Sequence, residues 1–97
     1  MSLNRYAKRR DDNEPDIVHA LRAIPGVSVV YMDKYFDLLV GYRAHNIALE
    51  VKMPGKETRK DQADQRTWRE NWPGQIQVVT SIDEAIHCVL NCYKTLR

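Results

Sequence analysis

The apolar residues of this chain are spaced so that they predict helices and strands in alternation. Ile17 and Leu21 recur at helical spacing. They predict a first helix that begins near Asp12 or Asn13, short polar residues that cap helices, and that ends at Pro25-Gly26. The hydrophobic pattern therefore opens the chain with an amphipathic helix.

Four β-rich runs and two further helices follow. The predicted strands are residues 27–32, 36–41, 46–52 and 75–80. A polar helix is expected over about 58–71, and a last helix over about 82–93 with Ser81 as its N-cap. The predicted order is α-β-β-β-α-β-α, an α/β fold with a mixed sheet flanked by helices. The 97 residues make one domain, in which residues 1–10 are predicted to be a mobile basic segment.

Composition describes an ordinary globular chain with no membrane-spanning stretch. Hydrophobic residues make up 43% and charged residues 29%, and no apolar run approaches the roughly 18 residues that a bilayer span needs. Cys88 and Cys92 predict a reducing compartment, so we expect a cytoplasmic protein without a membrane partner. His87 beside Cys88 suggests a metal site, but sequence neighbours diverge on a helix, and packing is the better interpretation.

Basic residues cluster although the net charge is only +2. The clusters predicted to bind nucleic-acid phosphates are Arg9 with Arg10 near the N-terminus, and Lys56, Arg59 and Lys60 after the third strand. A solvated surface is the simpler interpretation and is favoured on charge alone.

Charged residues inside two core strands are the strongest chemical signal. Asp37 precedes Leu38-Leu39-Val40, and Glu50 and Lys52 lie at the end of the third strand. If the hairpin turn is centred on Arg43 and Ala44, facing residues have indices that sum to 87 (37 + 50), and Asp37 faces Glu50. Carboxylates about 5 Å apart on one face repel, and a divalent cation such as Mg²⁺ or Mn²⁺ would relieve that repulsion.

Two helical residues extend this set. Glu14 shares the stripe of Ile17 and Leu21 that should face the core, although an acid in a first turn also complements the helix dipole. Gln65 has Trp68 and Trp72 at helical spacing on its own face, and a buried amide that caps backbone groups is an equal alternative. Gln62, in the same predicted helix, is a second candidate for the glutamine role.

These residues resemble the virus-type replication-repair nuclease (VRR-NUC) group of the PD-(D/E)xK nuclease superfamily. The resemblance covers about residues 13–90 and is carried by an ordered set of motifs. They are Glu14 with Ile17, Phe36-Asp37-Leu38-Leu39-Val40-Gly41, Leu49-Glu50-Val51-Lys52, the stretch from Ala63 to Gly74 that contains Gln65, and Gln77-Val78-Val79-Thr80-Ser81-Ile82-Asp83-Glu84-Ala85. Phe36 departs from the family, which often has proline there.

The resemblance implies a restriction-endonuclease-like core and a metal-dependent endonuclease that hydrolyses phosphodiester bonds. It implies catalytic roles for Glu14, Asp37, Glu50, Lys52 and Gln65. It further implies Mg²⁺ or Mn²⁺ ligands at Asp37, Glu50, the Val51 carbonyl and Glu14, directly or through water. The stand-alone members resemble Holliday-junction resolvases, so we expect a homodimer on branched DNA, and the family suggests a phage or prophage source in a bacterial host.

Other functions remain open at this point. The enzyme alternative is a nuclease of flap or duplex DNA in repair or restriction, and the non-enzymatic one is a nucleic-acid- or protein-binding module with the same fold. The dimer surface is not identified by the residues. Tyr31, Tyr35 and the last helix are candidates for it, with ordinary core packing as the simpler role of each.

Overall fold

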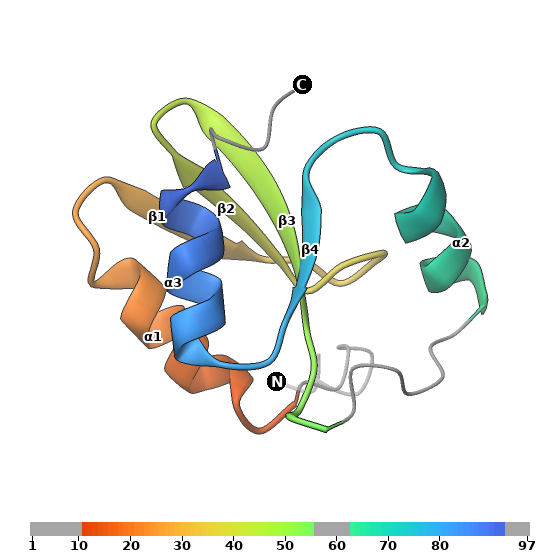
Figure 1. Cartoon of the computed structure of the whole chain (residues 1–97), viewed down its shortest axis with the longest axis horizontal. Helices are drawn as coiled ribbons and strands as arrows, with labels where there is room; N and C mark the ends of the chain where they lie inside the picture. Colours follow the sequence, from red (N-terminus) through yellow and green to blue (C-terminus); the bar gives the residue numbers. More distant parts are fainter. Residues whose placement is uncertain (1–10, 56–62, 93–97) are drawn as a thin grey trace, which may run out of the picture.

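The computed structural model describes residues 11–55 and 63–92 of the chain. Within them the elements follow the predicted order (Figure 1). They are α1 (Glu14–Arg22), β1 (Val27–Tyr31), β2 (Leu38–Tyr42), β3 (His45–Val51), α2 (Ala63–Asn71), β4 (Ile76–Val79) and α3 (Ile82–Leu90). The prediction of an α/β fold in the order α-β-β-β-α-β-α is confirmed. The predicted mobile segment 1–10 lies outside the described residues.

The described strands form one mixed sheet in the order β1-β2-β3-β4. β1, β2 and β3 pair antiparallel, and β4 pairs parallel to β3. The parallel pair needs a crossover, because two parallel strands cannot be joined by a tight turn. The chain makes this crossover through α2, which lies beyond β4 and away from α1 and α3 (Figure 1).

The hairpin between β2 and β3 has the predicted register. Tyr42 pairs with His45 and Leu38 with Leu49, so every pair sums to 87 (42 + 45, 38 + 49). Arg43 and Ala44 alone form the loop, with φ of 52° and 66°. Two consecutive positive φ angles are the signature of a type I′ turn, whose twist matches that of a hairpin. This turn fixes which side chains of the two strands share a face.

The core lies on one face of the sheet, beneath α1 and α3 (Figure 1). Leu38, Leu49 and Val51 point to this face and are buried against Ile17 and Leu21 of α1, among others. α3 adds Ala85 and Val89, and Cys92 is fully buried just after the helix. The packing role predicted for the cysteines is therefore confirmed for Cys92.

The helix ends have local causes. Ser81 caps α3 as predicted, because its hydroxyl accepts a hydrogen bond from the Glu84 amide at 3.1 Å. α1 ends at Arg22, before Pro25, and Gly26 has a φ of 83°, which favours glycine. No helix within the described ranges has the length and apolar character that would let it cross a bilayer.

Candidate active site

Side-chain alternation along β3 separates the core from a polar set of residues. Leu49 and Val51 belong to the core, so the residues between and after them, Glu50 and Lys52, project to the opposite face. Asp37 precedes β2, and its carboxylate reaches the end of β3 at Val51, between Glu50 and Lys52. The two predicted acids and the lysine thus meet at the end of β3.

Asp37 is held at the point where the β2–β3 ladder ends. Its carbonyl accepts the Met32 amide at 2.9 Å, and its own amide donates to the Leu49 carbonyl at 3.0 Å. The Asp37 carboxylate then accepts the Val51 amide through Oδ2 at 2.7 Å. The Ala48 and Lys52 amides donate toward β4, so the Val51 amide, offset by an odd number of residues, faces β2. The carboxylate of Asp37 thus takes the place of the next ladder carbonyl.

Glu50 lies beside this carboxylate and is paired with Lys52. The Lys52 Nζ is 3.4 Å from Glu50 Oε2, and Lys52 itself is half-buried. Asp37 is 5% and Glu50 4% exposed, so both carboxylates are largely withdrawn from water. Burial makes the attraction between the ammonium and the carboxylate stronger than it would be at the surface, and it makes a lost partner costly. Lys52 therefore has a fixed place next to Glu50.

Glu14 opens α1 and is buried, with 1% of its surface exposed. The prediction that it lies on the core-facing stripe with Ile17 and Leu21 is confirmed, since all three are buried. A first-turn acid that only complemented the helix dipole would have no need to leave water. Its position follows from its neighbour Asn13.

Asn13 fixes the start of α1 against the ends of two strands. Its Nδ2 donates to the Lys52 carbonyl and to the Thr80 carbonyl, each at 3.0 Å. Asn13 is the N-cap residue of α1, as expected, but its side chain makes no capping hydrogen bond. The capping role predicted for it is therefore wrong, because both amide protons are used to join α1 to β3 and β4. Sequence reasoning missed this link because its partners lie 39 and 67 residues away.

The carboxylates of Asp37 and Glu50 supply some of the oxygen ligands that a hard divalent cation needs. Asp37 and Glu50 supply carboxylate oxygens at the end of β3, where Asp37 Oδ2 accepts the Val51 amide, and Mg²⁺ is commonly held by one or two carboxylates with water completing the shell. Among the residues described, however, no three His, Cys, Asp or Glu side chains gather closely enough to hold a metal. Glu14 is therefore not in one direct ligand group with both acids. The Val51 carbonyl stays a predicted ligand, and the contact that is observed comes from the Val51 amide.

Several predicted site residues fall where the structure gives no description. Gln62, Lys56, Arg59 and Lys60, together with Arg9 and Arg10, lie outside the described residues. Gln65 is placed by its backbone in α2, and its side chain is outside the description. The roles predicted for these residues stay predictions.

Aromatic side chains outside the core were missed by sequence reasoning. The core packing predicted for Tyr31 and Tyr35 is wrong, because 43% and 38% of their surfaces are exposed. Tyr35 instead stacks on Trp68 of α2, with ring centroids 5.3 Å apart. The available signal was the spacing of Trp68 and Trp72, four residues apart on one helical face. It gave no hint of the partner in the β1–β2 loop.

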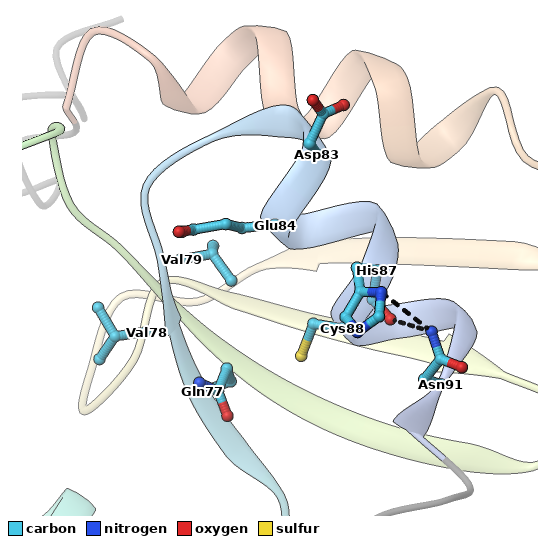
Figure 2. A pocket seen from close by; sticks show the side chains of 8 residues that line it. All are labelled: Gln77, Val78, Val79, Asp83, Glu84, His87, Cys88 and Asn91. Carbon is cyan, nitrogen blue, oxygen red and sulfur yellow. Dashed lines mark hydrogen bonds between the residues drawn. The ribbon is translucent and has the colours of Figure 1, made fainter.

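A separate cavity of about 520 Å³ lies between β4 and α3 (Figure 2). Its walls include Gln77 and Val79 of β4 and His87 and Cys88 of α3. Burial, with a smaller contribution from Cys92, raises the pKa of the Cys88 thiol to about 11, so this thiol is protonated near neutral pH and is a weak nucleophile. His87 Nδ1 lies 3.4 Å from Asn91 Nδ2. The cavity contains neither Asp37 nor Glu50, so it is distinct from the acidic site.

No protein-family model, curated protein or solved structure matches this chain. The resemblance to the VRR-NUC group therefore rests on the residues quoted for it and stays a prediction.

Proposed function

We propose that this protein is a metal-dependent endonuclease that hydrolyses DNA phosphodiester bonds at Asp37, Glu50 and Lys52. The observation that carries the proposal is that two buried carboxylates and a lysine meet around Val51 at the end of β3. Two buried carboxylates stand at neighbouring strands, and Lys52 Nζ lies 3.4 Å from Glu50 Oε2. The fold alone gives no reason to bury the Glu50–Lys52 pair, because replacing a buried ion pair with well-packed apolar residues is often neutral for stability.

The cofactor in this proposal is Mg²⁺ or Mn²⁺, held by Asp37 and Glu50 with water and the Val51 carbonyl. Such an ion polarises a phosphoryl oxygen and lowers the pKa of a bound water. Lys52 would stay close to Glu50 and stabilise negative charge that develops on the phosphate, which a partly desolvated ammonium does strongly. Gln65 would position the nucleophile or a backbone phosphate. Glu14 would bind the metal through water, because among the described residues it does not form one group of three close ligands with Asp37 and Glu50.

The finer proposal names branched DNA as the substrate and a homodimer as the active form. Two identical sites related by a two-fold axis could cut the two strands of a symmetric junction. Arg9, Arg10, Lys56, Arg59 and Lys60 would neutralise DNA phosphates in this arrangement. The location would be the cytoplasm, and for a phage or prophage protein that of a bacterial host.

Two alternatives differ in what they require of the acidic site. A nuclease of flap or duplex DNA needs the same three residues and differs only in substrate. A non-catalytic binding module needs neither buried acid, and the burial of both Asp37 and Glu50 argues against it.

The test is cleavage of a labelled four-way junction and of a linear duplex in Mg²⁺ and in Mn²⁺. The wild type is compared with Glu50→Gln and Lys52→Ala, with Asp83→Asn as a matched control because Asp83 is an exposed acid on α3. We expect the wild type and the control to cut junctions, and both site variants to lose most activity.

The outcomes separate the alternatives. Junctions left intact by the wild type in both metals would contradict the resolvase proposal, and cleavage of flaps or duplex instead would favour a repair or restriction role. Equal cutting by all four proteins would show that the residues are assigned wrongly. Binding without any cleavage would favour the non-catalytic module.

A further inference from the structure

Four aromatic rings form a stack outside the hydrophobic core. Tyr35 and Phe36, from the loop between β1 and β2, each stack on Trp68 with centroids 5.3 Å apart and planes within 23°. Trp68 stacks in turn on Trp72, with centroids 4.8 Å apart and planes at 20°. The loop reaches out from the sheet toward α2, so two segments distant in sequence build one aromatic stack (Figure 1).

The stack leaves aromatic surface in water. Trp72 is 46% and Tyr35 38% exposed, whereas Trp68 and Phe36 are half-buried and none of the four belongs to the core. A single exposed ring is common on a protein surface, but exposed rings gathered in one place mark a binding surface more often than chance.

The backbone is unusual next to both exposed rings. Tyr35 has a φ of 74°, a left-handed conformation that is unfavourable for a residue with a side chain. At Gly74, an added Cβ would lie 2.6 Å from Trp72 Nε1, so the indole occupies space that only glycine leaves open. The Tyr35 ring therefore depends on an unusual backbone conformation, and the Trp72 ring depends on the absence of a side chain at Gly74.

The stack adjoins the acidic site and carries positive charge. Phe36 directly precedes Asp37, so the platform begins one residue from a proposed metal ligand. Lys34 Nζ lies 5.6 Å from the centroid of the Tyr35 ring, and Arg66 is exposed on α2. Aromatic rings interleaved with basic groups are the combination that binds single-stranded nucleic acid, where bases stack on the rings and phosphates meet the cations.

We propose that the exposed rings of this stack, Tyr35 and Trp72, bind unpaired nucleobases by stacking, close to the acidic site of Asp37 and Glu50. The inference rests on the proposed nuclease function and narrows its substrate. In continuous duplex each base face is already covered by its neighbours, so a stacking platform favours DNA in which bases are unpaired, as at junctions, flaps and overhangs.

The test measures DNA binding without cleavage, by fluorescence anisotropy of a labelled thymidine oligonucleotide in EDTA. Two other ligands are compared with it, an abasic oligonucleotide of the same length and charge and a blunt duplex, and the thymidine oligonucleotide is also measured at raised salt. The proteins are the wild type, Trp72→Ala, Tyr35→Ala and Gly74→Ala, which displaces the Trp72 ring without deleting it. Ile82→Ala, at an exposed apolar residue of α3, is the matched control.

We expect the wild type and the control to bind the thymidine strand more tightly than the abasic strand. Trp72→Ala and Tyr35→Ala should each weaken thymidine binding about five- to a hundredfold, the range that corresponds to stacking on one base. Their affinity for the abasic strand should be unchanged, and Gly74→Ala should lie between Trp72→Ala and the wild type. Circular dichroism checks that each variant is folded.

Equal affinity of the wild type for the thymidine and abasic strands would overturn the proposal. An unchanged thymidine affinity in folded Trp72→Ala would also overturn it. If that variant changed its mass in sedimentation but not its DNA binding, this surface would be an interface between two copies of the chain. Because no metal is present, the result is independent of the cleavage assay. If the protein binds unpaired bases but cuts no DNA, this inference stands and the nuclease proposal is wrong.

Discussion

The two faces of the β2–β3 ladder are built from alternate residues of the same strands, yet they differ in kind. On the face under α1 and α3, Leu38, Leu49 and Val51 are packed in an apolar core. Glu50 points to the other face, and it and Asp37, which precedes β2, are nearly as well buried but carry charge, with Lys52 paired to Glu50. The apolar side chains stabilise the sheet, whereas the similarly buried acids are the residues to which a function is proposed.

The largest expected effect on stability lies on the apolar face. Leu49→Ala removes a fully buried side chain and leaves a cavity, which should lower the free energy of unfolding by about 2–5 kcal/mol. Urea denaturation followed by circular dichroism measures it. Glu50→Gln, next in sequence, leaves no cavity and keeps an oxygen acceptor for Lys52, so it should cost less than Leu49→Ala. If both variants lost the same stability, the contrast between the faces would be wrong.

Substitutions of Asp37 test whether this buried acid also stabilises the fold. Asp37→Ala deletes the acceptor of the buried Val51 amide and should cost about 1–3 kcal/mol. Asp37→Asn keeps an oxygen acceptor and should cost less, while it removes the charge that a metal needs. The same unfolding measurement compares the two. A larger loss for Asp37→Asn than for Asp37→Ala would contradict the hydrogen-bond account.

A substitution of Asn13 shows whether this residue acts as a helix cap or joins α1 to β3 and β4. Aspartate is as good an N-cap residue as asparagine, so a capping role predicts that Asn13→Asp is nearly neutral. The observed link predicts a loss of about 1–2 kcal/mol, because two donors to the Lys52 and Thr80 carbonyls are replaced by oxygens. Thermal unfolding at neutral pH decides between them, with Asn13→Ala as the reference.

The smallest effect expected near neutral pH is that of Cys88, on the side of the sheet that carries α3, because it appears only at alkaline pH. Because the Cys88 pKa is about 11 in the folded chain and 9.0 for an ordinary thiol, the unfolded chain releases this proton first. Stability from Cys88 is therefore fully present below pH 9 and is lost as the pH rises toward 11. Cys88→Ser should flatten that part of the stability curve. Alkylation of Cys88, followed by mass spectrometry, should be slow at neutral pH and should accelerate when urea unfolds the chain.

Local patterns were enough to predict the element order and the hairpin. The turn at Arg43 and Ala44 sets the register of β2 and β3, and alternation along β3 then turns Glu50 away from the core residues Leu49 and Val51. These predictions succeeded because each depends on residues close together in sequence.

Features made by distant segments could not be predicted in this way. Asn13 binds residues far along the chain, and Tyr35 meets Trp68 only because the β1–β2 loop and α2 come together in space. The same limit applies to Glu14. Its burial follows from helical spacing, but its separation from the other acids depends on how α1 packs on the sheet.

The most direct test of the central claim is Mn²⁺ binding measured by isothermal titration calorimetry. The claim predicts that the wild type and the exposed-acid control Asp83→Asn bind Mn²⁺ alike. Asp37→Asn and Glu50→Gln should each weaken binding at least about tenfold, which is the loss of about 1.4 kcal/mol. If folded Asp37→Asn and Glu50→Gln bind Mn²⁺ as tightly as the wild type, the polar face of this sheet is not a metal site.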